Sequence, residues 1–101
     1  MDADPRLLLL HPDDNVFVAR DQIAKGESIA IGGRKHELDF DLRLGHKIAR
    51  RDIAAGERIL KYGAPIGRAT RAIATGEHVH VHNVVSDYTP TYVIENGGKA
   101  A

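Results

Sequence analysis

The sequence predicts one small, mostly-β domain with short helical turns, and three observations lead to this fold class. A motif of the form Ile-Ala-x-Gly-Glu occurs three times, with its glycines at Gly26, Gly56 and Gly76. Between residues 36 and 44, apolar and charged side chains alternate, which is the period of a half-buried strand. The long 3.6-residue periodicity of an amphipathic helix is absent, so a sheet covered by helices is excluded.

Each copy of the motif predicts a corner between two strands. The isoleucine of each copy should fill the core, and the segment before the glycine is too short for a free-standing helix, so we expect a single helical turn there. Glycine ends that turn because it adopts positive φ at little cost. A strand leaves each corner, and the expected strands are 28–31, 58–61 and 78–82. The glycines are unequally spaced, which disfavours a solenoid with a fixed repeat.

The remaining segments complete the β structure. Leu7 to Leu10 is expected to form a short buried strand, followed by a turn at residues 11–15. Gly32-Gly33 is typical of a hairpin turn. The alternating segment should turn four apolar side chains toward the core, namely Leu38, Phe40, Leu42 and Leu44.

Length and composition narrow the function. We expect a single domain over residues 1–101, with a core at about 7–83 and a tail at 84–101 that either frays or docks on a partner. Fourteen Lys and Arg balance fourteen Asp and Glu, so no basic face for a nucleic acid is implied. Cysteine is absent, which excludes disulfides and thiolate chemistry. No apolar run approaches the ~20 residues of a membrane span, and the expected location is cytoplasmic.

Three alternating histidines are the main candidates for chemistry. If residues 78–82 form a straight strand, His78, His80 and His82 share one face and the intervening valines share the other. The outer pair then lie about 13 Å apart, so at most two imidazoles converge on one ion. Neutral imidazole is also a general base near neutral pH. The alternative is a solvated or hydrogen-bonded row of histidines without a ligand.

Three further segments, together with the corners, resemble a known domain. These segments are 45–49 (Gly-His-Lys-Ile-Ala), 61–67 (Lys-Tyr-Gly-x-Pro-Ile-Gly) and 78–83 (His-Val-His-Val-His-Asn). Together they resemble the SAF domain, a compact β-clip fold, at the N-terminus of altronate and galactarate dehydratases. The same module resembles the separate small subunit of split dehydratases and of sulfolactate sulfo-lyase. The resemblance runs from about Leu7 to Asn83, and the corners alone would be weaker evidence.

The resemblance implies a lyase. The chain would be the small subunit of a sugar-acid dehydratase, inactive alone, whose large catalytic subunit is a second polypeptide. A divalent metal, iron or manganese, would be shared with or held by that subunit, and the substrate would be a small carboxylic acid. A homo-oligomer is left open. Two alternatives remain, the small subunit of a sulfolactate sulfo-lyase and a non-catalytic carbohydrate-binding or assembly module.

Specific residues follow from the same resemblance. His80 and His82 are the expected catalytic residues and the candidate metal ligands, whereas His78 is expected to matter less. Either lysine of the matched motifs could neutralise a substrate carboxylate, and Asn83 could contact substrate or cap a turn. The full set of candidate substrate-binding residues is His46, Lys47, Lys61, Tyr62 and Asn83.

Overall fold

The computed structural model describes residues 4–86, which contain nine short strands and no helix. The mostly-β prediction is therefore confirmed. Residues 4–86 contain no helix that could cross a membrane. The strands are β1 (Leu7–Leu8), β2 (Val16–Ala19), β3 (Ser28–Ile31), β4 (Arg34–Glu37), β5 (Lys47–Ala49), β6 (Arg58–Lys61), β7 (Ala64–Ala69), β8 (His78–Val79) and β9 (Val84–Val85).

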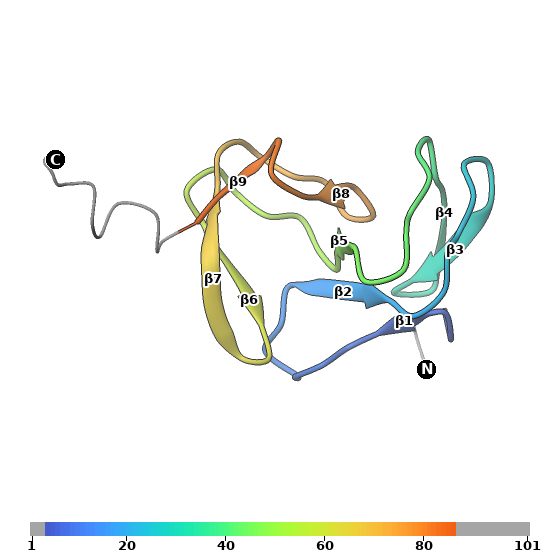
Figure 1. The fold of residues 1–101 in the computed structure, drawn as a ribbon, viewed down its shortest axis with the longest axis horizontal. Coiled ribbons are helices and arrows are strands. Elements are labelled where there is room, and N and C mark those ends of the chain that lie inside the picture. Colours follow the sequence, from blue (N-terminus) through green and yellow to red (C-terminus); the bar gives the residue numbers. More distant parts are fainter. Residues whose placement is uncertain (1–3, 87–101) are drawn as a thin grey trace, which may run out of the picture.

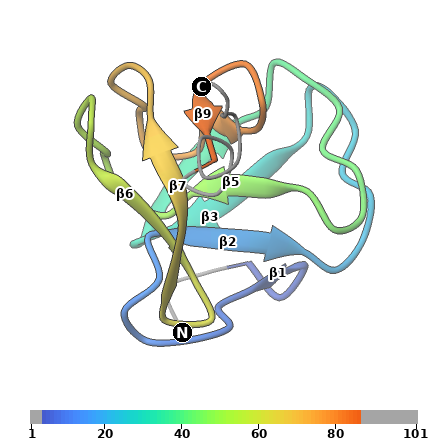
Figure 2. The same ribbon diagram turned by 60° about the vertical axis from the view of Figure 1, so that its left-hand side comes forward.

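The strands form three antiparallel sheets. The central sheet has the order β1-β2-β5-β8, so residues from the two ends of the chain meet in one layer. The β3–β4 hairpin lies on one side of it and the β6–β7 hairpin on the other, with β9 paired to β7 (Figures 1 and 2). The tail predicted at 84–101 thus begins with two residues in a strand, and residues 87–101 lie outside the described part.

The three corners pack as expected but turn differently. The corner isoleucines are buried, and Gly26, Gly56 and Gly76 all have positive φ, between 83° and 92°. The predicted helical turns are hydrogen-bonded β-turns instead. In the second corner, the Glu57 amide donates to the Ala54 carbonyl at 3.0 Å, and the first and third corners repeat this bond. One hydrogen bond closes a β-turn, whereas a helical turn would first require the unfavourable nucleation of a helix. The short segment therefore forms a β-turn. The corner isoleucines are Ile23, Ile53 and Ile73.

The alternating segment after the first hairpin is not a continuous strand. The hairpin turn at Gly32-Gly33 is confirmed, but β4 ends at Glu37. Leu38 and Leu42 are buried, as the alternation predicts, and Leu42 forms an isolated bridge with Ile23. Leu44, by contrast, is 66% exposed. The period of two therefore correctly predicted that Leu38 and Leu42 enter the core, was wrong for Leu44, and did not predict the bends between them.

Two small cores stabilise the domain in place of one. The first is centred on Phe17 and Ile48, and the second on Ile53, Ile59 and Val79. Because β2 and β5 run through the middle, alternate residues of these strands enter different cores. The second core is the one that supports β5 and β8, where the candidate functional residues lie.

Candidate functional site

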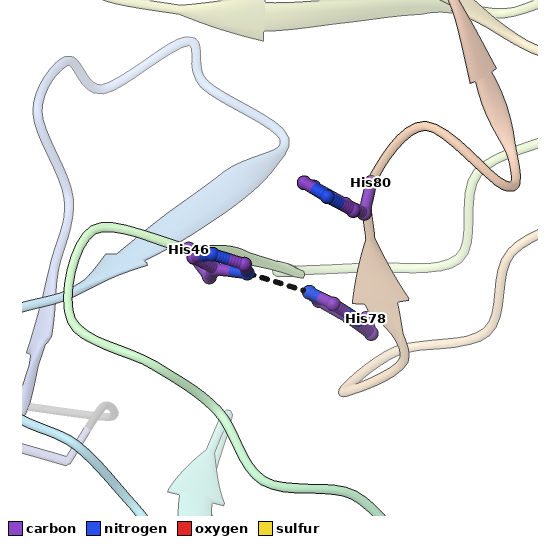
Figure 3. A group of neighbouring side chains, drawn as sticks. All are labelled: His46, His78 and His80. Carbon is purple, nitrogen blue, oxygen red and sulfur yellow. Dashed lines mark hydrogen bonds between the residues drawn. The ribbon is translucent and has the colours of Figure 1, made fainter.

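Pairing of β5 with β8 assembles a cluster of histidines. Lys47 pairs with Val79 and Ile48 with His78, so the antiparallel register places His46 opposite His80. His78 and His80 are two residues apart and therefore share that face. His46, which comes from a segment far away in the sequence, thus joins two histidines of the third corner (Figure 3).

The rings in this cluster stack. The centroids of His46 and His80 lie 4.9 Å apart, those of His78 and His80 lie 5.2 Å apart, and Nδ1 of His46 lies 3.1 Å from Nε2 of His78. Phe40 stacks on the other side of His78 at 5.0 Å. One ring nitrogen from each of His46, His78 and His80 lies within 4.8 Å of the other two. We call these three residues the histidine cluster.

The predicted straight strand at 78–82 is wrong, because β8 ends at Val79. Residues 80–83 form a β-turn in which the Asn83 amide donates to the His80 carbonyl at 3.0 Å. Val81 is consequently 81% exposed, although Val79 is fully buried. His82 leaves the expected row as well, and its ring is tilted by 43° against that of His78, with centroids 5.6 Å apart.

Asn83 holds this turn from inside the protein. Its side chain is fully buried, its Oδ1 accepts a hydrogen bond from the His80 amide at 2.9 Å, and its Nδ2 donates to the His78 carbonyl at 2.7 Å. Of the two roles open to Asn83 in the sequence, the structure shows the turn cap. It fixes the backbone of His78 and His80, since one side chain bridges them.

The electrostatics around His78 and His80 favour their neutral imidazoles. Burial, reinforced by the neighbouring histidines and Lys47, lowers the pKa of His78 to about 4. Burial and the same kind of repulsion also lower the pKa of His80. The pKa of Lys47 is lowered, first by burial and then by Lys61. His78 is therefore unprotonated at neutral pH, with its nitrogen lone pair available to a proton, a metal ion or a hydrogen-bond donor.

Tyr62 is not brought to the histidine cluster. It lies in the β6–β7 turn with φ of 57°, and the buried Asp14 carboxylate accepts hydrogen bonds from the amides of Tyr62 and Gly63. Lys61 lies against the Tyr62 ring, 5.8 Å from its centroid, while still close enough to Lys47 to affect its pKa. The substrate contacts predicted for Lys47, Lys61 and Tyr62 stay predictions.

The donor set of the cluster fits a transition-metal ion. Imidazole suits iron and zinc, and ligands must be unprotonated to bind, a condition that the low pKa of His78 meets. Metal–nitrogen bonds of about 2.1 Å place ligand nitrogens at most about 4.2 Å apart, so the 4.8 Å limit requires only a small contraction. The contact between His46 and His78 would have to open, and the stacked rings would have to rotate.

The structure places His78 between Phe40, His46 and His80. The sequence predicts that His78 matters less than His80 and His82, and their relative importance stays a prediction. The register of β5 against β8 decides the position of His78, and strand pairing between distant segments is not visible in a local period. The only available signal was Asn83, because a turn-forming residue so close to a strand favours an early end.

Comparison with known proteins identifies the family of this chain. Residues 5–87 match the model of the altronate/galactarate dehydratase SAF domain. The chain belongs to this family. Altronate dehydratase of Bacillus subtilis is 43% identical over 91 residues, which cover 82% of this chain and 18% of that protein. Altronate dehydratase of Escherichia coli is 45% identical over 74 residues, covering 73% of this chain and 15% of that protein.

A second kind of relative in the comparison is shorter. The (2R)-sulfolactate sulfo-lyase subunit alpha of Chromohalobacter salexigens is 56% identical over 51 residues, which cover 46% of this chain and 54% of that subunit. The chain therefore spans less than a fifth of the two altronate dehydratases and about half of this sulfo-lyase subunit. This SAF domain is thus similar to part of each of these two kinds of protein.

Proposed function

We propose that this SAF domain supplies the histidine cluster to the active site of a sugar-acid dehydratase and acts together with a larger catalytic polypeptide. The observation that supports the proposal is the cluster itself, in which His46 and His78 and His80 converge within a family whose relatives are named as lyases. Most of the length of those dehydratases has no counterpart in this chain, so the remaining catalytic groups come from elsewhere.

Dehydration of a polyhydroxy acid sets two requirements. A base must remove the proton next to the carboxylate, and the departing hydroxide must be neutralised. The cluster histidines would hold a divalent metal ion, which supplies Lewis acidity when bound. His82 lies beside the cluster but outside the group of three converging nitrogens, and it can accept a proton as a neutral imidazole. His80 and His82 thus take different roles in the proposal, the first as a ligand and the second as the base.

A sulfo-lyase is the second candidate. The sulfo-lyase relative is named as a subunit, and this chain covers a far larger share of it than of the dehydratases. The same parts would then assist the departure of sulfite in place of hydroxide. The two candidates differ only in the leaving group, so they are separated by substrate and not by the histidine cluster.

Metal binding by the chain alone tests the proposal without any activity assay. We expect Fe²⁺ or Mn²⁺, titrated anaerobically by calorimetry, to bind one equivalent per chain, and His78→Ala to weaken binding by at least about 100-fold. Loss of a direct ligand should exceed the 10–100-fold typical of outer-shell partners. Arg58→Ala is the matched control, because Arg58 occupies the same place after the second corner as His78 does after the third.

Turnover provides the second readout. The chain alone should neither dehydrate altronate or galactarate nor release sulfite from sulfolactate. Once combined with its catalytic polypeptide, His82→Ala should lower kcat by roughly 10²–10⁴-fold, the usual contribution of a general base. Equal metal affinity in His78→Ala and the unchanged chain would contradict the role of the cluster in metal binding. Full turnover with His82→Ala would contradict the role of His82 as the general base.

A further inference from the structure

A hollow beside the histidine cluster has no role in the proposed chemistry. It has a volume of about 240 Å³ and is lined by residues on or next to β5, β6, β7, β8 and β9. Ile59, Ile66, Val79 and Val84 form its apolar lining, and Lys47, His80, Val81 and Ser86 complete it. Since His80 belongs to both the hollow and the cluster, the hollow adjoins the candidate active site.

The mostly apolar lining favours an apolar group over a sugar acid as the occupant. Such a substrate carries a hydroxyl on nearly every carbon, and each would lose its water against isoleucine and valine without a hydrogen-bonding partner. An aliphatic or aromatic side chain, by contrast, gains by entering an apolar hollow of this size. The occupant is therefore apolar, although it sits next to a site for a highly polar substrate.

The rim of the hollow points to a protein as the source of that side chain. Val81 is 81% exposed at the tip of the turn that Asn83 holds, and Val85, the neighbour of Val84 on β9, is 50% exposed. Exposed valines around an apolar hollow are typical of the anchor region of an interface.

The charge at the rim specifies the partner further. Lys47 is half-buried and is repelled by Lys61. Within residues 4–86, the acidic side chains that form ion pairs do so with other basic residues, and Lys47 has no acidic partner. A half-buried lysine without a counter-ion is unfavourable, and a carboxylate from outside would remove this cost.

We propose that the hollow is the docking site for the catalytic polypeptide of the lyase, which inserts an aliphatic or aromatic side chain there and places a neighbouring Asp or Glu against Lys47. This inference rests on the proposed function. It assigns Lys47 to assembly and not to the substrate carboxylate that the family resemblance implied. Docking at this point would also cover the open side of the histidine cluster and keep water from the reaction.

Site-specific photo-crosslinking in the organism that carries this sequence tests the docking face. A benzophenone side chain at position 81 should crosslink to a polypeptide that mass spectrometry identifies as the remainder of a dehydratase or sulfo-lyase. The control position is Lys35, an exposed residue of the β3–β4 hairpin on the far side of the central sheet (Figure 1). It should give no crosslink to that polypeptide.

The outcomes separate this inference from the proposed function. A crosslink from position 81 to a second copy of the chain, to its own residues after Ser86, or to nothing overturns the docking site but leaves metal binding and turnover to decide the lyase. A crosslink only from the control position also overturns it. A crosslink to a polypeptide unrelated to lyases overturns both proposals.

Matched substitutions then measure the two parts of the contact. With the purified pair, Val81→Asp and Lys47→Met should each raise the Kd by at least about 10-fold, whereas Leu9→Asp should leave it unchanged. Leu9 is an apolar residue next to β1 that is 41% exposed. At saturating partner, Lys47→Met should keep the KM for substrate. A raised KM with unchanged assembly would return Lys47 to substrate binding and overturn its docking role.

Discussion

The second and third corners of this domain share one backbone frame and differ in what they carry. The amides and carbonyls of Ile53 and Ile73 hydrogen-bond to each other at 2.8 Å. The Gly56 amide donates to the Ala69 carbonyl, and the Gly76 amide donates to the Ala49 carbonyl, both at 2.8 Å. Each corner glutamate accepts a hydrogen bond from the amide three residues earlier and pairs with an arginine, Arg51 or Arg71. The corners are thus related by an approximate two-fold axis.

The correspondence continues into the strands. Asn15 is buried, accepts from the Leu60 amide at 2.8 Å and donates to the Arg58 carbonyl at 2.8 Å. Asn83 makes the same two bonds to His80 and His78. Arg58 and Leu60 therefore correspond to His78 and His80. The two corners share this geometry but carry different side chains, so the shared frame is structural, and only the strand after the third corner begins with a histidine.

Replacing each of the two supporting asparagines with alanine separates effects on stability from effects on metal binding. Both Asn15→Ala and Asn83→Ala should lower the free energy of unfolding by about 1–3 kcal/mol, because each leaves two backbone groups without a partner. Only Asn83→Ala should weaken metal binding, by about 10–100-fold, as expected for a group that orients ligands. Calorimetric metal titration and urea unfolding measure the two effects. Equal metal affinity in both variants would mean that Asn83 is purely structural.

The corners and the histidine cluster differ in how much of their structure could be predicted from the sequence. The corners, their glycines and their buried isoleucines follow from local chemistry, and all were predictable. The histidine cluster was predictable only in part, since His78 and His80 lie in one motif while His46 arrives through the register of β5 on β8. The bends after Glu37 and Val79 were missed because hydrogen bonds to distant or turn-forming groups outcompeted a regular period.

The corner glycines should respond unequally to alanine. Both have φ of 83°, so each substitution should cost roughly 1 kcal/mol or more from left-handed strain. A Cβ at Gly56 would meet open space, but at Gly76 it would lie 3.3 Å from Nδ1 of His36. Gly76→Ala should therefore cost about 1 kcal/mol more than Gly56→Ala.

The difference can be assigned to one contact. Removing the ring with His36→Ala should make the two glycine substitutions equally costly when stability is measured by urea unfolding. If Gly76→Ala is still the worse substitution in that background, the extra cost arises from the third corner's backbone and not from His36.

The smallest expected difference is in the response to pH of the metal-free chain. His78 has a folded-state pKa of about 4, whereas an unfolded histidine titrates near 6.5. Between these values the unfolded chain binds more protons, so the stability contributed by the neutral His78 is complete above pH 6.5 and is lost as the pH falls toward 4.

Nuclear magnetic resonance titration of the ring signals measures the pKa of His78 directly. Substitution of neighbouring residues tests what lowers this pKa. His46, His80, His82 and Lys47 all repel a proton on His78, although burial is the larger effect. His80→Ala should therefore raise the titration midpoint of His78 only part of the way toward 6.5, and Arg58→Lys should leave it near 4. A midpoint close to 6.5 in the unchanged chain would mean that water reaches the stacked rings freely, in which case the third corner would differ from the second in sequence but not in the environment it creates.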